Sequence, residues 1–142
     1  DEKVLPHVFE ISMGIDRSLY TILEHSLKND KEHERMVLSL KPYLSPVHVG
    51  ILSLVKKDGL KEKTDEIFLN IKRKFDAFLD HSGAIGRRYR RLDEIGAPFA
   101  ITVDHQTLED NTVTIRKRDS MEQSRVDISK IDSILLESVG FP

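Results

Sequence analysis

Eight residues near the N-terminus bring together a carboxylate, a hydroxyl and a guanidinium group. They read Glu10-Ile11-Ser12-Met13-Gly14-Ile15-Asp16-Arg17. Residues two apart lie on the same side of an extended segment, so Glu10 and Ser12 would point the same way. Apolar residues at helical spacing after Gly14 place Arg17 in the first turn of a helix. The open N–H groups of a helix start and a guanidinium both favour an anion. The alternative is a solvated Asp16–Arg17 pair on a surface helix.

A second group of residues is strongly basic and lies on a predicted helix that follows Gly83-Ala84-Ile85-Gly86. Its arginines are Arg87, Arg88, Arg90 and Arg91. Several of them share one helix face with Glu94, and Tyr89 offers a ring on which a splayed RNA base could stack. These features indicate contact with RNA. The alternative is a solvated helix on which Arg90 pairs with Glu94.

A third group lies between Thr114 and Arg125 and mixes guanidinium donors with carboxylate and amide groups. Arg116, Arg118 and Asp119 are its candidate binding residues. Such a mixture can contact base edges as well as phosphates. The alternative is an edge strand whose charged residues prevent aggregation.

The chemical groups require elements that position them, and the sequence predicts an α/β fold. Residues 4–11 resemble a strand, and the polar stretch 28–35 is typical of a surface loop or a boundary. Residues 47–54 form an apolar run typical of a strand buried on both faces of a parallel sheet. The order after residue 46 predicts a mixed five-stranded sheet flanked by helices. The expected strands are 47–54, 78–79, 99–103, 112–116 and 123–126, and the expected helices follow Leu60, follow Gly86 and span 128–139.

Composition limits the possible classes of protein. The 142 residues are 39% hydrophobic and 32% charged, with a net charge of -2. This composition indicates a soluble globular protein whose basic residues form local patches. No apolar run is long enough for a membrane span, and no cysteine is available for a thiolate metal site. The six histidines are scattered, so no metal site is predicted. The chain starts at Asp1 without an initiator Met, which suggests a piece of a longer protein.

Taken together, the three groups resemble the dimeric glycyl-tRNA synthetases. Residues 10–17 resemble their version of class II motif 3, and residues 82–96 are similar to the signature of their anticodon-binding domain. Residues 112–121 give a third match, in the same order. The resemblance divides the chain into residues 1–45, the motif 3 end of a catalytic domain plus a linker, and residues 46–142, an anticodon-binding domain.

The resemblance also implies roles for individual residues. Arg17 would bind the terminal phosphate of ATP, and Glu10 and Ser12 would recognise glycine. The residues implied to contact the anticodon of tRNA(Gly) are Arg87, Arg88, Arg90, Arg91, Asp93, Arg116, Arg118 and Asp119. Carboxylates such as Asp93 or Asp119 could accept from the amino group of cytosine. The implied full-length enzyme is a cytoplasmic homodimer that joins glycine to tRNA with ATP and Mg²⁺. It is not expected to bind a membrane.

Two departures from the family pattern bear on activity. Ile11 stands where the family usually has proline, and class II motifs 1 and 2 are absent. The chain alone should therefore not activate an amino acid. Two alternatives are a non-catalytic RNA-binding module, because Gly83 to Gly86 imitates the Gly-x-x-Gly clamp of KH domains, and a synthetase-derived accessory subunit. The segment from Glu10 to Arg17 argues against both.

Overall fold

A computed structural model describes residues 3–55 and 59–140 of the chain. Within these residues an N-terminal extended segment precedes a mixture of helices and strands. The order is α1 (Ile15–Ser26), β1 (Leu27–Asp30), β2 (Arg35–Leu38), η1 (Pro42–Leu44), β3 (Val49–Ser53), α2 (Leu60–Ile71), β4 (Ala77–Asp80), α3 (Ile85–Ile95), β5 (Phe99–Val103), α4 (His105–Asp110), β6 (Thr112–Lys117), β7 (Gln123–Asp127), η2 (Ile128–Lys130) and α5 (Ile131–Val139).

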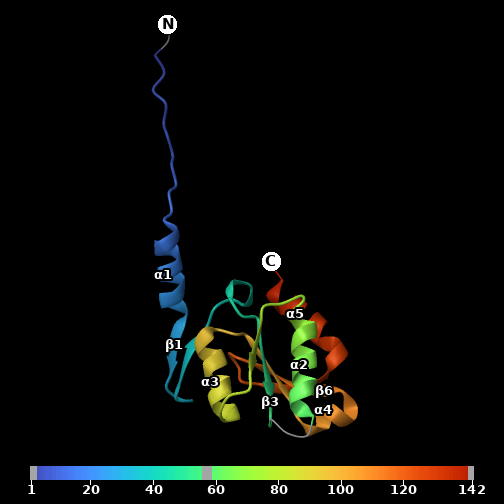
Figure 1. The fold of residues 1–142 in the computed structure, drawn as a ribbon. Coiled ribbons are helices and arrows are strands. Elements are labelled where there is room, and N and C mark those ends of the chain that lie inside the picture. The colour runs from blue at the N-terminus through green and yellow to red at the C-terminus, as the bar shows by residue number, and fades with distance from the viewer. Residues whose placement is uncertain (1–2, 56–58, 141–142) are drawn as a thin grey trace.

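The main sheet has five strands in the order β4-β3-β5-β6-β7. The strands β4, β3 and β5 are parallel, whereas β6 and β7 run antiparallel to their neighbours. Parallel neighbours need long crossovers, and the helices α2 and α3 provide them. The mixed five-stranded sheet flanked by helices is therefore confirmed. We call this sheet with its helices, residues 49–139, the sheet domain (Figure 1).

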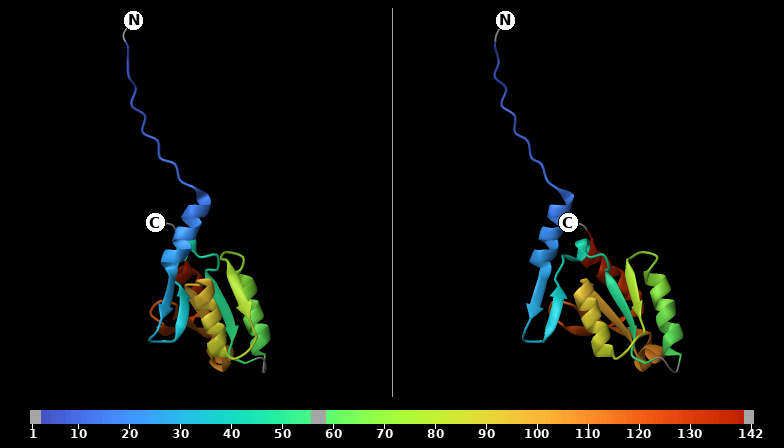
Figure 2. Two further views of the ribbon diagram at one scale, coloured as in Figure 1. Left: turned by 90° about the vertical axis from the view of Figure 1, so that its left-hand side faces the viewer. Right: turned by 60° about the vertical axis from the view of Figure 1, so that its left-hand side comes forward.

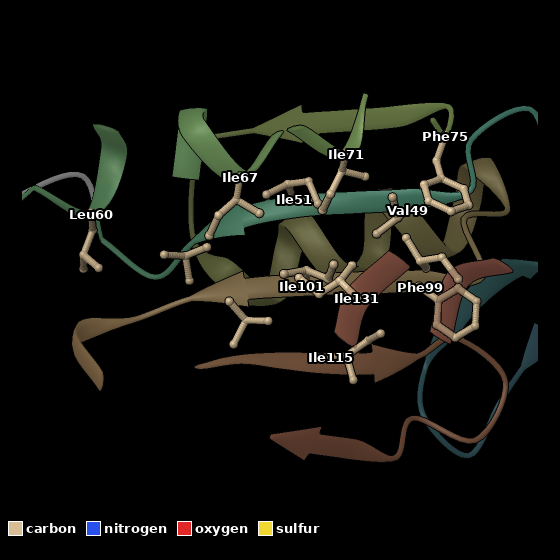
Figure 3. Packing of buried hydrophobic residues seen from close by; sticks show 13 residues of the cluster. Val49, Ile51, Leu60, Ile67, Ile71, Phe75, Phe99, Ile101, Ile115 and Ile131 are labelled. Carbon is tan, nitrogen blue, oxygen red and sulfur yellow. The ribbon is translucent and has the colours of Figure 1, made fainter. Parts of the chain in front are cut away.

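Two apolar clusters hold the helices against opposite faces of the sheet. The larger one joins residues of β3, β5 and β6 to α2 and α5, and it includes Ile51, Ile101 and Ile131 (Figure 3). The smaller one joins Leu52 and Ala100 to Leu92 of α3. A Cβ atom at Gly50 would stand 2.2 Å from Leu92 Cδ1, so glycine is needed there for the close packing of α3. All five residues of β3 are buried, as the apolar run predicted.

Residues 3–38 differ in form from the sheet domain, and we call them the arm. Residues 3–14 have no regular secondary structure and extend away from the sheet domain (Figure 1). The predicted strand at residues 4–11 is therefore wrong. A strand needs a neighbour for its backbone groups, and no described residue pairs with this segment. The predicted helix after Gly14 is confirmed as α1, but it has no buried residue.

Two further predictions need correction. Residues 28–35 are not a plain loop, because β1 and β2 pair there as an antiparallel hairpin that lies beside α3 (Figure 2). The short helix α4 was not predicted. It begins with a capping box in which Asp104 accepts from the Thr107 N–H and Thr107 accepts from the Asp104 N–H. No helix within the described residues is long and apolar enough to cross a membrane.

Candidate nucleic-acid interface

Helix α3 carries the predicted arginines, and glycine residues mark its limits. Gly83 precedes it with φ of 79°, and Gly96 ends it with φ of 84°. Ala84 stands at the N-cap without a side-chain cap, so the first N–H groups of the helix remain open. Because α3 packs on the sheet through Leu92, the arginines divide between an outer and an inner side.

Arg87 and Arg90 are exposed on the outer side, together with Glu94. Neither guanidinium group makes a hydrogen bond or an ion pair with any residue that the structure describes, and the alternative Arg90–Glu94 pair is not formed. At 100° per residue, Arg90 lies closer than Arg87 to the side of α3 that carries Asp93. These two guanidinium groups are therefore available to an external anion.

Arg88 points to the inner side and is 4% exposed. Its Nη1 donates to the carbonyl oxygens of Ser53, at 2.5 Å, and Asp80, at 3.4 Å. Its buried Nε has no partner within the described residues. Burial lowers the pKa of this guanidinium from its usual value. Arg88 thus ties α3 to the ends of β3 and β4.

Arg91 is half-exposed and pairs with the buried Asp80. Its Nε and Nη2 lie 2.9 and 2.5 Å from Asp80 Oδ2, and Nη2 also donates to the Ser82 carbonyl. Burial would raise the pKa of Asp80, but hydrogen bonds from Ser82 and Arg91 outweigh it and hold the pKa below its usual value. Arg91 therefore fixes the turn before α3.

Asp93 is 1% exposed and receives two arginines from different segments. Arg35 Nη1 of β2 donates to its Oδ2 at 2.9 Å, and Arg116 of β6 donates to both oxygens at 2.9 and 3.1 Å. Arg35 also donates through Nε to Asp30. Burial would lower the pKa of Arg35, but Asp30 and Asp93 raise it above its usual value.

Arg118 is the largest fully buried side chain, at 2% exposure. Its Nη1 donates to the carbonyl oxygens of Leu38 and Gly96, and its Nη2 donates to that of Leu40. Asp119 is exposed and accepts from Arg118 and from Ser39. Arg118 is the first cause that holds the pKa of Asp119 below its usual value, against the effect of burial.

The predicted anticodon residues thus separate into distinct environments. Arg87 and Arg90 are open, Arg91 and Asp119 are accessible but paired, and the other four are interior residues with partners inside the protein. These four are Arg88, Asp93, Arg116 and Arg118. Inside the protein, carbonyl and carboxylate groups solvate the three buried guanidinium groups in place of water, and two guanidinium groups solvate Asp93.

The Tyr89 ring is less free than the sequence indicated. Its hydroxyl lies 2.5 Å from Thr102 Oγ1, and the Arg116 guanidinium lies 5.0 Å from the centre of its ring. The ring packs against the smaller apolar cluster. Tyr89 is therefore part of the junction between α3 and the sheet.

The same face of the sheet continues past α3 as a row of polar residues. Thr102 lies opposite Thr114, and Thr114 lies opposite Arg125. Thr102 is buried beneath Tyr89, whereas Thr114 and Arg125 are half-buried. Arg125 Nη2 lies 2.8 Å from Asp104 Oδ1, and Asp104 is the first cause that raises the pKa of Arg125. We call Thr102, Thr114 and Arg125 the polar row.

Sequence reasoning grouped Arg125 with other basic residues but did not select it as a binding residue. The alternation of side chains between the two faces of β7 could have identified Arg125. Val126 packs on the larger apolar cluster, so its neighbour Arg125 faces the α3 side. Arg87 and Arg90, with the two half-buried members of the polar row, Thr114 and Arg125, form a candidate surface for a nucleic acid.

The residues of the arm that were predicted to bind substrates, Glu10, Ser12 and Arg17, are distant in sequence from this surface. Ser12 and Arg17 line a shallow depression of about 530 Å³ at the start of α1, whose other lining residues are Met13, Gly14, Ser18, Thr21 and Ile22. Glu10 is exposed nearby in the sequence but does not line it. The Arg17 guanidinium has no partner within the described residues. An anion at the open N-terminus of α1 could use it.

Comparisons with known proteins bear on both regions. A family profile described as "Anticodon binding domain" matches residues 48–138. The chain is 49% identical over 143 residues to a glycine–tRNA ligase of Methanococcus vannielii, covering 97% of this chain and 24% of that protein. It is 50% identical over 139 residues to the glycine–tRNA ligase of Archaeoglobus fulgidus, covering 95% and 24%. The chain thus spans about a quarter of the length of these curated relatives.

A solved structure provides a comparison of folds. The RNA binding domain of threonyl-tRNA synthetase from Cryptosporidium parvum Iowa II superposes with a TM-score of 0.65 at 23% sequence identity. The superposition covers 73% of this chain and 26% of that one. At this identity the likeness shows a shared fold.

Proposed function

The chain belongs to the anticodon-binding domain family, and from this membership we propose that it binds the anticodon of a tRNA as part of a glycine–tRNA ligase. The observation that carries the proposal is the family match over residues 48–138, which contain both α3 and the polar row. The near 50% identity to archaeal glycine–tRNA ligases supports tRNA(Gly) as the partner in this proposal.

Within this proposal, Arg87 and Arg90 contact phosphates of the anticodon loop. Both are exposed and lack partners among the described residues, so binding costs no internal ion pair. The half-buried Thr114 and Arg125 present hydroxyl and guanidinium groups beside α3, where base edges could reach them. Asp119 stays a candidate acceptor for a cytosine amino group, because its carboxylate is exposed. The buried residues Asp93, Arg116 and Arg118 support this surface from inside.

A titration with tRNA tests the proposal. The 142-residue chain should bind tRNA(Gly), and replacing either of the last two anticodon cytosines should weaken binding about ten- to a hundredfold. Arg90→Ala should reduce the slope of log affinity against log salt by about one, since one phosphate contact is lost. Arg73→Ala is the matched control, because Arg73 is exposed in the turn after α2. Equal affinity for all anticodons at two salt concentrations would reject anticodon recognition.

For the whole protein, we propose the ligation of glycine to tRNA(Gly) with ATP and Mg²⁺ by a homodimer. ATP would supply the free energy that activates the carboxyl group of glycine. Arg17 would hold a phosphate at the start of α1, where it lines the same depression as Gly14 and Ser18 of the first helical turn. Glu10 would face the ammonium group of glycine, and Ser12 would complete that pocket.

An exchange assay tests the role of the arm. A ligase that contains this chain should catalyse glycine-dependent ATP–pyrophosphate exchange, and Arg17→Ala should lower the rate about ten- to a hundredfold because a charge-assisted contact is lost. Glu10→Gln should raise the glycine requirement more than the ATP requirement. Full exchange in the Arg17→Ala enzyme would reject the motif 3 assignment. A protein without exchange activity but with anticodon binding would instead be a non-catalytic RNA-binding module.

A further inference from the structure

The arm and the sheet domain are joined by buried charges rather than by a flexible linker. The strand β2 lies against α3, and Arg35 of β2 is only 8% exposed. Its Nη1 reaches both Asp93 Oδ2 and the Arg118 carbonyl oxygen, at 2.9 and 3.0 Å. Arg118 in turn donates to the carbonyl oxygen of Leu38, the last residue of β2. Both ends of β2 are thus held.

The helix α1 continues directly into this hairpin and is hydrogen-bonded to the residue that follows it. Its C-cap residue Leu27 is also the first residue of β1, and the Leu27 N–H donates to the Leu23 carbonyl oxygen. The Ser39 N–H donates to the Ser26 carbonyl oxygen at 2.7 Å. The direction of α1 therefore follows the direction of the hairpin (Figure 2).

Asp93 lies on the same helix as the exposed Arg90, three residues away. One α-helix thus carries both the carboxylate that anchors the arm and a guanidinium available to RNA. Arg116 of the sheet domain also forms an ion pair with Asp93. Apolar packing between the arm and α3 is small by comparison, since no residue of α1 is buried and the buried apolar residue of the hairpin is Val37.

We propose that Asp93 is a positioning residue that, through Arg35, fixes the angle at which α1 leaves the sheet domain. It thereby sets the place of Arg17 relative to the RNA-binding side of α3. The second part of this inference rests on the proposed function, whereas the first does not. Asp93 contacts no substrate. The effect of Asp93 on tRNA charging would arise because one tRNA must contact the α3 surface and the site of Arg17 at the same time.

The chain contains no cysteine, so paired spin labels can be introduced without interference. Labels at Glu24→Cys in α1 and Glu109→Cys in α4, both exposed positions, report the distance between arm and sheet domain. The unmodified background should give one narrow distance distribution. Arg35→Met should broaden it severalfold, because the arm loses its contact while the Asp93–Arg116 pair keeps the sheet domain intact. Asp93→Asn should broaden it as well.

Arg116→Met is the matched control, because it also removes one arginine from Asp93 but leaves the Arg35 contact in place. Its distribution should stay narrow. A narrow distribution in Arg35→Met, or equal broadening in Arg116→Met, would overturn the inference. Folding of each variant is checked by circular dichroism, and Arg35→Met remains informative if Asp93→Asn does not fold.

The link to tRNA is tested in the ligase that contains the chain. Arg35→Met should lower kcat for tRNA charging by about a hundredfold, because a displacement of about 1 Å is that costly. The KM for tRNA and the glycine-dependent exchange rate should stay unchanged, and a residue that only stabilises the fold would not produce this separation. Normal charging by Arg35→Met would overturn the link. Absence of exchange in the unmodified enzyme would reject the proposed function but leave the spin-label result decisive.

Discussion

The arm and the sheet domain contain similar apolar residues but use them in opposite ways. In the arm, Phe9 is 89% exposed and Ile15 is 85% exposed, whereas Ile51 and Ile101 of the sheet domain are fully buried. Both regions carry the periodic patterns from which helices and strands are predicted. The spacing of apolar residues therefore identifies which side of a helix or strand is apolar. Burial of that side also requires a second apolar surface that packs against it. In the sheet domain that surface is part of the same 142 residues.

The largest expected contrast concerns stability. Ile51→Ala should lower the free energy of unfolding by about 2–5 kcal/mol, because it leaves a cavity between β3 and α2. Phe9→Ala should change it by less than about 0.5 kcal/mol, since its ring contacts no core. Urea unfolding of the 142-residue chain measures both. A loss above about 1 kcal/mol for Phe9→Ala would show that the extended segment folds onto the rest of the chain in solution.

A smaller contrast concerns helix caps. Asp104→Ala removes the capping box of α4 together with the Arg125 ion pair, and the cap alone should account for a loss of about 0.5–2 kcal/mol. In the arm, Gly14 caps α1 without a side-chain hydrogen bond and is exposed, so Gly14→Ala should change the stability by less than about 0.5 kcal/mol. Thermal unfolding and helix content by circular dichroism report these changes. Equal losses would mean that α1 and α4 depend on their caps to the same extent.

The smallest expected effect is a pH dependence at the junction of the two regions. Hydrogen bonds from Arg35 and His33 lower the pKa of Asp30 to about 2. Its usual pKa is about 3.9. Since the folded-state value is depressed, Asp30 stabilises the hairpin above about pH 4, and this contribution is lost as the pH falls through about 2. Amide exchange of β1 and β2 between pH 5 and 2 should show the loss.

Asp30→Asn should remove this pH dependence, whereas Asp76→Asn, an exposed change away from the hairpin, should retain it. Hairpin amides that keep full protection down to pH 2 would contradict the role of Asp30. Because Arg35 connects Asp30 to Asp93, a loosened hairpin at low pH would also loosen the arm. Spin labels placed as above would detect that change.

Much of the sheet domain could be predicted because its signals are local. The apolar run of β3 and the alternation of Val113 and Ile115 in β6 each follow from neighbouring residues. The helix α4 escaped prediction because it has only six residues, although Asp104 and Thr107 at capping-box spacing were a usable signal. Helix α1 was predicted correctly, yet its exposure was not, since no local pattern shows what stands opposite a helix.

The candidate site was harder to predict because charge alone does not reveal burial. Arg118 and Arg90 look alike in the sequence. The carbonyl oxygens that surround Arg118 come from Leu38, Leu40 and Gly96, which lie between 22 and 80 positions away in the chain. Only the fold brings them together. Arg90, by contrast, occupies an outward position that the helical period alone determines.

The joint at Asp93 also orders events during synthesis of the chain. Arg35 is synthesised 58 positions before Asp93, and Leu38 is synthesised 80 positions before Arg118, which donates to its carbonyl oxygen. At roughly 5–20 residues per second, the 80 positions take on the order of 4 to 16 seconds. Before Asp93 is made, Arg35 can pair with Asp30 of its own hairpin but lacks the carboxylate that ties the hairpin to α3. The arm is made first but can dock only after β6 is complete, so a nascent chain that stalls before Arg116 would present the arm undocked.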